Sequence, residues 1–226
     1  MKFISKRNKE PEELSTYRET PGVTYDSIGK EIKDIIKKSL LEEQGYICAY
    51  CMGKIKCDTC TIEHYISQKR HETSPYSEEE HKRNSLLYIN MSGVCVNDSI
   101  HCDKHRGNVP LEILNPHHST CEELITYNLG GNIVPKGHEQ EKVTKDIETL
   151  GLDCEKLKKQ RSATWDDVWQ RFKQEHEKKD WSKELFLEYA NIYRNKKNTR
   201  KGLRYHAYCN FIAWCFEHYA LNFKKL

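Results

Sequence analysis

The pattern of apolar and polar positions along this chain is mainly helical, with short stretches of strand character. The clearest helical stretch covers residues 30–44, where isoleucine and leucine recur at helical spacing and lysine and glutamate occupy the opposite positions. Gly45 follows at the place typical of a helix C-terminal cap. This helix leads directly into a cysteine-containing turn, so we expect it to hold that turn against a core.

Two short strands are predicted on either side of a polar segment. Residues Thr61–Ile66 and Leu86–Cys95 have strand character. Residues 67–85 between them are almost all polar, which indicates a solvated loop or a short helix. A further helix is expected to start within His101–Asn108, before Pro110 interrupts it.

The pattern divides the chain into three predicted parts. Residues 1–29 mix charge with proline and glycine and are predicted to be an extended N-terminal arm with turns. Residues 30–116 form a central part, and residues 117–226 a mainly helical C-terminal region. In that region we expect a strand at Cys121–Tyr127 and a turn before Ile133. Helices are predicted over residues 144–150, 154–161, a segment capped by Thr164 or Asp166, residues 181–193 and residues 205–223.

Charge by itself does not indicate a nucleic-acid-binding protein. The 226 residues carry 37 Lys and Arg against 34 Asp and Glu, a net charge of +3. One basic run, residues 194–201, is either a solvated loop or a phosphate-contacting patch. Its candidate nucleic-acid contacts are Lys196, Lys197, Arg200 and Lys201. The sequence has neither an apolar stretch of the roughly 20 residues that cross a bilayer nor a signal-peptide core, so we expect a cytoplasmic protein without a membrane partner.

Ten cysteines in a reducing compartment favour metal ligation over disulfides. The pairs Cys48–Cys51 and Cys95–Cys102 can together supply the four thiolates of a tetrahedral structural zinc site. A second Cys-x-x-Cys, Cys57–Cys60, leaves alternatives open. This pair could replace Cys95 and Cys102, bind a second metal, or be buried as small apolar side chains.

An acidic residue and a histidine adjoin in the first predicted strand, between the two cysteine pairs. Glu63 is a candidate ligand for a hard divalent cation, and His64 a candidate general base near neutral pH. Asn90, on the second predicted strand, could orient His64 through its side-chain amide or its backbone. His105 or His101, at the head of the next helix, could be another ligand of a catalytic Mg²⁺ or Mn²⁺ ion.

These residues resemble the HNH, or ββα-metal, nuclease motif. More narrowly, they are similar to the HNH nucleases encoded beside an ATPase in bacterial anti-phage operons, the PtuB component of Septu systems and related retron-associated effectors. The resemblance is carried by residues 41–51, Ile62–His64, residues 87–91 with Cys95, and residues 102–108. It differs from the family pattern in having the second knuckle and in a one-residue shift of the last motif histidine.

The resemblance implies an α+β fold with a zinc-stapled ββα-metal centre in a mainly helical chain. It implies that His64 is the general base, Glu63 a ligand of the catalytic ion and Asn90 the middle asparagine of the motif, with Cys48, Cys51, Cys95 and Cys102 as the zinc ligands. The expected activity is phosphodiester hydrolysis in anti-phage defence, controlled by an operon-encoded ATPase, with DNA favoured. A nuclease acting on tRNA or other structured RNA and a non-catalytic zinc-binding adaptor are the alternatives.

Overall fold

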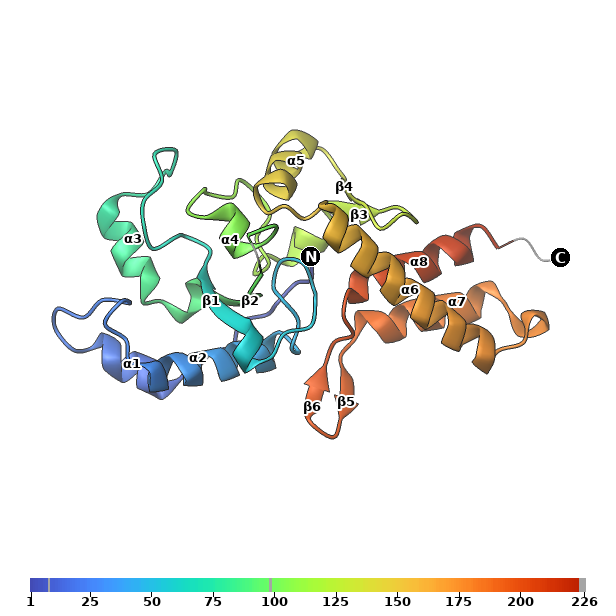
Figure 1. Ribbon diagram of the computed structural model, residues 1–226, viewed down its shortest axis with the longest axis horizontal. Coiled ribbons are helices and arrows are strands. Elements are labelled where there is room, and N and C mark those ends of the chain that lie inside the picture. Colours follow the sequence, from blue (N-terminus) through green and yellow to red (C-terminus); the bar gives the residue numbers. More distant parts are fainter. Residues whose placement is uncertain (8, 98, 224–226) are drawn as a thin grey trace.

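The computed structural model describes residues 1–7, 9–97 and 99–223 (Figure 1). Helices and small antiparallel sheets alternate, which confirms the prediction of a mixed α and β chain. Figure 1 places the N-terminal elements α1 to α4 at one end of the molecule and helices α6 to α8 at the other. The first half contains α1 (Glu12–Arg18), α2 (Lys30–Glu43), β1 (Cys60–His64), α3 (Glu78–Ser85), β2 (Met91–Cys95) and α4 (Asp103–Arg106).

Strands β1 and β2 form an antiparallel pair in which Cys60 lies opposite Cys95 and His64 opposite Met91. α4 follows β2, and these three elements are called the ββα unit below. Helix α2 packs against the pair, burying Ile36 and Leu40 in one apolar cluster with Ile62. The predicted strand that begins at residue 86 is shorter in the structure, because residues 88–90 form a 3-10 turn before β2.

The predicted N-terminal arm contains a helix and reaches the core. α1 has Pro11 at its N-cap, acidic residues in its first turn and Arg18 in its last, which suits the helix dipole. The sequence did not indicate α1, because Leu14 is its only buried side chain and leaves no apolar stripe. Met1 and Ile4 are buried in the main core.

The second half contains β3 (Ile125–Tyr127), β4 (Ile133–Pro135), α5 (Gln140–Thr149), α6 (Glu155–Glu175), α7 (Lys183–Arg194), β5 (Lys197–Thr199), β6 (Gly202–Arg204) and α8 (Cys209–Leu221). The strand predicted from Cys121 starts at Ile125, after a 3-10 turn. The prediction of two helices within residues 154–172 was wrong. α6 is continuous, because the hydroxyl of Thr164 donates to the carbonyl of Gln160 one turn back instead of capping a new helix.

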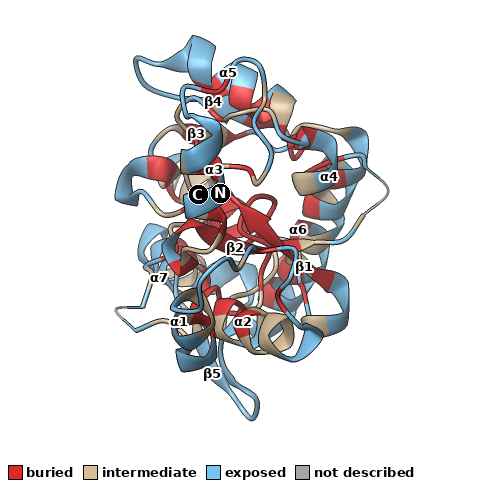
Figure 2. Cartoon of the chain, turned by 90° about the vertical axis from the view of Figure 1, so that its left-hand side faces the viewer, coloured by how far each residue is buried: buried red, intermediate tan, exposed pale blue. Residues whose placement is uncertain are grey.

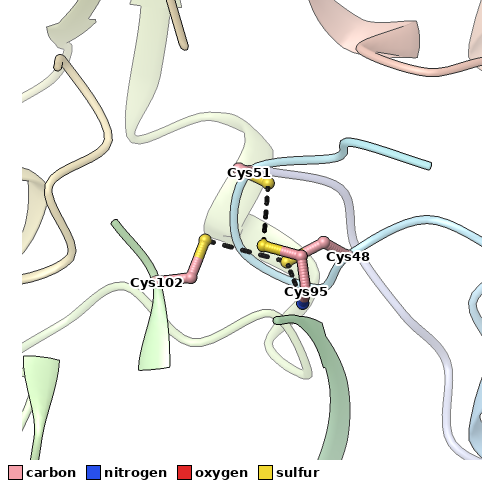
Figure 3. A group of neighbouring side chains, drawn as sticks. All are labelled: Cys48, Cys51, Cys95 and Cys102. Atoms are coloured by element: carbon pink, nitrogen blue, oxygen red, sulfur yellow. Dashed lines mark hydrogen bonds between the residues drawn. The ribbon is translucent and has the colours of Figure 1, made fainter. Parts of the chain in front are cut away.

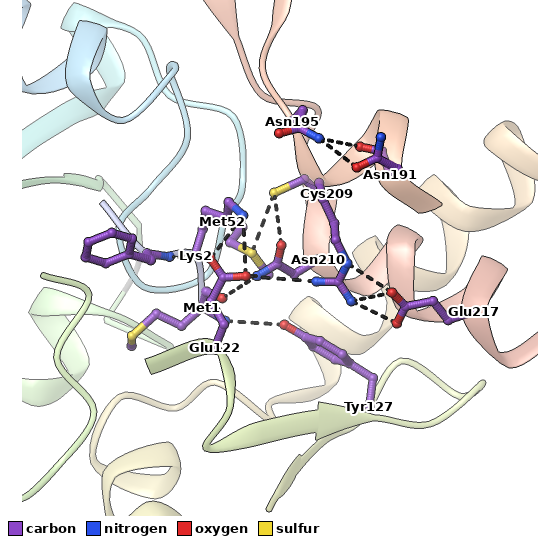
Figure 4. A network of polar contacts seen from close by, with 12 residues as sticks. Met1, Lys2, Met52, Glu122, Tyr127, Asn191, Asn195, Cys209, Asn210 and Glu217 are labelled. Carbon is purple, nitrogen blue, oxygen red and sulfur yellow. Dashed lines mark hydrogen bonds and ion pairs between the residues drawn. The ribbon is translucent and has the colours of Figure 1, made fainter. Parts of the chain in front are cut away.

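A polar network ties the first residues to the C-terminal helices (Figure 4). The amide of Asn210 on α8 donates to the Met1 carbonyl at 2.8 Å and to the Glu122 carboxylate at 2.9 Å. Glu122 also pairs with the Lys2 ammonium at 3.0 Å. Figure 2 shows the buried residues concentrated along β1, β2 and the inner faces of the helices. The ββα unit packs on two apolar clusters, one shared with α1 and α2 and a main core that both halves of the chain build.

In the described part of the chain, no helix is both long enough and apolar enough to cross a bilayer.

Candidate metal centre and catalytic site

Four cysteines from three separate segments meet at the base of the ββα unit (Figure 3). Cys48 and Cys51 lie in the turn after α2, Cys95 ends β2 and Cys102 precedes α4. Their sulfur atoms all lie within 4.8 Å of one another. The Cys48–Cys102 and Cys51–Cys95 sulfur pairs are each 3.8 Å apart. Zinc–sulfur bonds of about 2.3 Å in a tetrahedron place the sulfurs about 3.8 Å apart, so the four cysteines can hold a zinc ion.

The protonation of these cysteines also fits a cation site. Hydrogen bonds from the thiols of Cys102, Cys48 and Cys51 lower the pKa of Cys95, which favours its thiolate. Burial raises the pKa of Cys48 and of Cys102 well above the usual range. A bound cation would favour the thiolate forms, because cysteine ligates a metal ion after losing its proton.

Nitrogen donors surround the sulfur cluster. The amide of Cys95 donates to the Cys48 sulfur, and the amide of Gly53 to the Cys51 sulfur, each at 3.4 Å. His101 is buried, and its Nδ1 lies 3.2 Å from the Cys102 sulfur. Such contacts orient metal ligands and spread the negative charge of the thiolates. The structure therefore places His101 beside the sulfur cluster.

The second Cys-x-x-Cys does not join the cluster. Among the described residues, the only group of three or more possible metal ligands is the set of four cysteines. Cys60 is buried on β1, and its thiol donates to the carbonyl of Thr61. Of the alternatives for Cys57 and Cys60, this burial fits the packing of Cys60 as a small apolar side chain.

Glu63 and His64 are neighbours in the chain, but their side chains have separate surroundings. Successive side chains of a strand point to opposite faces. Glu63 contacts Arg106 of α4, whereas His64 contacts Ser85 at the end of α3 and the ring of Tyr25. Both residues are buried, at 7% and 2% exposure.

The partners of His64 determine its tautomer. Nε2 lies 3.0 Å from the carbonyl oxygen of Ser85, which only accepts, so Nε2 carries the proton. The other ring nitrogen, Nδ1, accepts from the amide of Gln68 at 3.1 Å. Burial lowers the pKa of His64 to about 4, so the ring is neutral near pH 7. His64 thus presents one basic nitrogen, which is covered by Gln68.

Glu63 lies at the centre of a buried charge cluster. Glu63 Oε1 accepts from the Arg106 guanidinium at 2.7 Å and from the Tyr50 hydroxyl at 3.2 Å. Burial raises the pKa of Glu63 to about 8, with Arg106 opposing this shift and the nearby Asp103 side chain adding to it. The cluster therefore contains two carboxyl groups, Glu63 and Asp103, from β1 and α4.

Asn90 fixes the chain just after His64. Its side-chain oxygen accepts from the amide of Ile66 at 2.8 Å, and its side-chain nitrogen donates to the Ile66 carbonyl at 2.9 Å. The Asn90 carbonyl accepts from the amide of Tyr65, also at 2.9 Å. Asn90 therefore orients the end of β1 through the backbone, within the range of roles that the sequence left open.

The structure brings Asp103, and not His105, to Glu63. Residues three apart on a helix share a face, so Asp103 and Arg106 both lie toward Glu63. His105 is exposed on another side of α4, with Nδ1 3.2 Å from the Ser99 carbonyl. Sequence reasoning missed Asp103. The spacing of Asp103 and Arg106 in α4 was the available signal, but the sequence does not show which side of this short helix faces β1.

An open groove with basic residues adjoins His64. Its volume is about 400 Å³, and it is lined by Tyr25, Gln68 and Ser85, which all contact His64. The groove also contains three cations and two acids, namely Lys69, Arg70, Lys82, Asp26 and Glu78. Sequence reasoning assigned these cations only to a solvated segment.

The predicted basic patch divides into a half-buried part, Lys196, and an exposed part. The Lys196 ammonium donates to the Glu43 carbonyl at 2.6 Å, so Lys196 caps the C-terminus of α2. Lys197, Arg200 and Lys201 are exposed on the β5–β6 hairpin.

Comparison with protein-family models and with curated proteins finds no match to this chain.

Proposed function

We propose that this chain is a metal-dependent nuclease of the HNH type that hydrolyses phosphodiester bonds in nucleic acid, with DNA favoured. The observation that carries the proposal is a neutral, tautomerically fixed histidine, His64, at the end of β1. It belongs to a ββα unit whose four cysteines can hold zinc, and it adjoins a groove lined by cations. A general base needs an unprotonated nitrogen, and a phosphate substrate needs nearby positive charge. The resemblance to anti-phage HNH nucleases extends the proposal to defence under the control of a partner ATPase.

In the proposed mechanism, His64 takes the proton of the attacking water at Nδ1. The Ser85 carbonyl holds the ring through Nε2 and fixes this tautomer. The Gln68 amide must leave Nδ1 when the water binds, because one lone pair accepts one proton. Lys69, Arg70 and Lys82 would bind the phosphates on either side of the scissile bond.

Glu63 and Asp103 are the residues that would hold a catalytic Mg²⁺ or Mn²⁺ ion. Hard divalent cations prefer carboxylate oxygens, and the proximity of the buried Glu63 to the partly exposed Asp103 fits that preference. When bound, such an ion would neutralise charge on the scissile phosphate. Arg106 holds Glu63 Oε1 and thereby orients this carboxylate.

The main alternative is a non-catalytic zinc-binding adaptor. His64 is 2% exposed and hydrogen-bonded at both ring nitrogens, and Glu63 is paired with Arg106. These contacts also describe a set of side chains that only holds the fold together. In that case the zinc-binding unit would present a surface to a partner.

Substituting His64→Ala tests the proposal. We expect cleavage to fall by about two to four orders of magnitude, because a positioned base contributes that much. Zinc content and the circular dichroism spectrum should be unchanged, and His138→Ala, at an exposed position, is the control. Cleavage of duplex DNA and of bulk tRNA would be measured with Mg²⁺ or Mn²⁺, with and without the ATPase. Equal activity of the variant and the wild type would exclude His64 as the base.

A further inference from the structure

The β5–β6 hairpin is a projecting element that the proposed reaction does not use. Figure 1 shows it extending from the junction of the two halves of the molecule, away from the ββα unit. Every residue of β5 is exposed, and Leu203 on β6 is 56% exposed. Within the two strands, Arg204 alone is half-buried. An isolated two-stranded hairpin is marginally stable in water, so its exposed strands and tip indicate an element kept for contacts with a partner.

The hairpin carries only positive charge. Between Arg194 and His206 the sequence contains no Asp or Glu. Lys197 lies directly opposite Arg204 in the strand register, and like charges in this position destabilise a hairpin. Arg200 and Lys201 occupy the turn at the tip. The Lys197 ammonium lies over the ring of Tyr193 and the Arg204 guanidinium over that of Tyr46. The hairpin as a whole concentrates positive charge.

These cations are not neutralised by the protein. Lys197, Arg200 and Lys201 form no ion pair with any residue in the described ranges. Lys201 lines a groove of about 420 Å³ between the hairpin and the C-terminus of α2. The two acids of that groove are already paired, Glu43 with Lys6 and Glu42 with Arg7.

We infer that the β5–β6 hairpin is a docking arm for the phosphodiester backbone of nucleic acid, outside the reaction centre. The inference takes its ligand class from the proposed function. The hairpin turn is pre-ordered, because the Thr199 hydroxyl donates to the Gly202 carbonyl at 2.7 Å and accepts from the Lys201 amide at 3.2 Å. A two-stranded ribbon fits the major groove of a duplex, where its cations reach phosphates on both strands.

The salt dependence of binding tests this inference. The double variant Arg200→Ala/Lys201→Ala would be compared with Lys173→Ala/Lys183→Ala, which removes two exposed cations from α6 and α7. Binding of a 30-base-pair DNA duplex and of tRNA would be measured by fluorescence anisotropy over a range of salt concentrations, in a His64→Ala background without Mg²⁺.

We expect the hairpin variant to bind about tenfold more weakly, with the slope of log affinity against log salt reduced by about 2, one for each lost phosphate contact. The control variant should bind as the unsubstituted protein does. The polymer whose binding shows this dependence identifies the source of the phosphodiester backbone. An unchanged slope with both polymers, or an equal loss in the two double variants, would overturn the inference.

Cleavage is measured in a separate experiment, so that a failure of the nuclease proposal can be distinguished from a failure of the docking-arm proposal. Restoring His64 in the hairpin variant should leave the maximal rate on saturating substrate unchanged, because the hairpin lies outside the reaction centre. If the wild type does not cleave and hairpin-dependent binding persists, the nuclease proposal fails and the docking arm stands. A hairpin variant with normal binding but a lower maximal rate would place the hairpin in the reaction centre and overturn its assignment as a docking arm.

Discussion

Arg106 is the charged residue on which the geometry of the candidate site most depends. Its side chain is fully buried, and it donates to the Tyr50 hydroxyl and to Glu63 Oε1. The remaining hydrogen bonds are made to the carbonyl oxygens of His64, Tyr65 and Val109. A buried guanidinium is tolerated only when its donors are satisfied, so these contacts hold α4 and the end of β1 in one arrangement.

The sequence suggested His105 as the second ligand of the proposed catalytic ion, whereas the structure places Asp103 near Glu63. Two variants distinguish these alternatives. We expect Asp103→Asn to reduce metal-dependent cleavage by about 100-fold or more, because a neutral amide is a poor ligand for a hard cation. His105→Ala should reduce cleavage less than about threefold, because His105 is exposed and contacts Ser99. Cleavage would be titrated with Mn²⁺ for both variants.

Zinc analysis is the control for that comparison, because Asp103 adjoins the zinc candidate Cys102. Both variants should retain the zinc of the wild type. The opposite order of activities, with His105→Ala inactive and Asp103→Asn active, would restore His105 as the ligand that the sequence suggested.

At the scale of elements, the end of helix α2 positions the first two cysteines. The helix ends in a left-handed glycine cap: the amide of Gly45 donates to the Glu42 carbonyl, and that of Tyr46 to the Leu41 carbonyl. Gly45 has φ of 59°, and a Cβ atom there would lie 2.8 Å from Cδ2 of Tyr205. The close packing of this turn against the chain before α8 therefore requires glycine.

Substituting Gly45→Ala should lower the free energy of unfolding by about 2–4 kcal/mol, because backbone strain and a steric clash add. Gly22→Ala is the control, because Gly22 also has positive φ, at 78°, but open space around it. That control should cost about 1 kcal/mol through strain alone. Urea denaturation measures both values. Equal losses would show that Tyr205 relaxes away without cost.

At the scale of the whole molecule, the four cysteines connect segments that are far apart in the chain. Cys48 and Cys102 lie 54 positions apart, and their sulfurs meet where α2, β2 and α4 converge. Cys48 and Cys51 also belong to the main apolar core, which extends to α8. A metal ion bound at this point would therefore stabilise both the ββα unit and its attachment to the rest of the protein.

Substituting Cys51→Ala should remove the bound zinc and lower the midpoint of thermal unfolding by on the order of 10 °C, because metal affinity is part of the folding free energy. Cys57→Ala is the matched control, since Cys57 lies outside the sulfur cluster. Elemental analysis and a thermal melt measure the two effects. Full zinc content in Cys51→Ala, or its loss in Cys57→Ala, would contradict the assigned ligand set.

The sequence by itself determined the features that depend on local periodicity and on ligand chemistry. The apolar spacing of residues 30–44 predicted α2 nearly to its ends, because a helix must place its apolar side chains on one face. The two cysteine pairs predicted the observed cluster, because tetrahedral zinc requires four ligands and each pair supplies two. The mixed α and β character followed from the same patterns.

Only the tertiary structure decided which side chains meet. The direction of Glu63 and His64 depends on the strand pairing, and the choice of Asp103 over His105 depends on how α4 is rotated against β1. The coverage of His64 by Gln68 and the projection of the β5–β6 hairpin are likewise consequences of packing. The spacing of residues in the chain restricts which of them share a face of a helix or strand. Which face is buried depends on contacts between distant segments, because these contacts form only when the whole core packs.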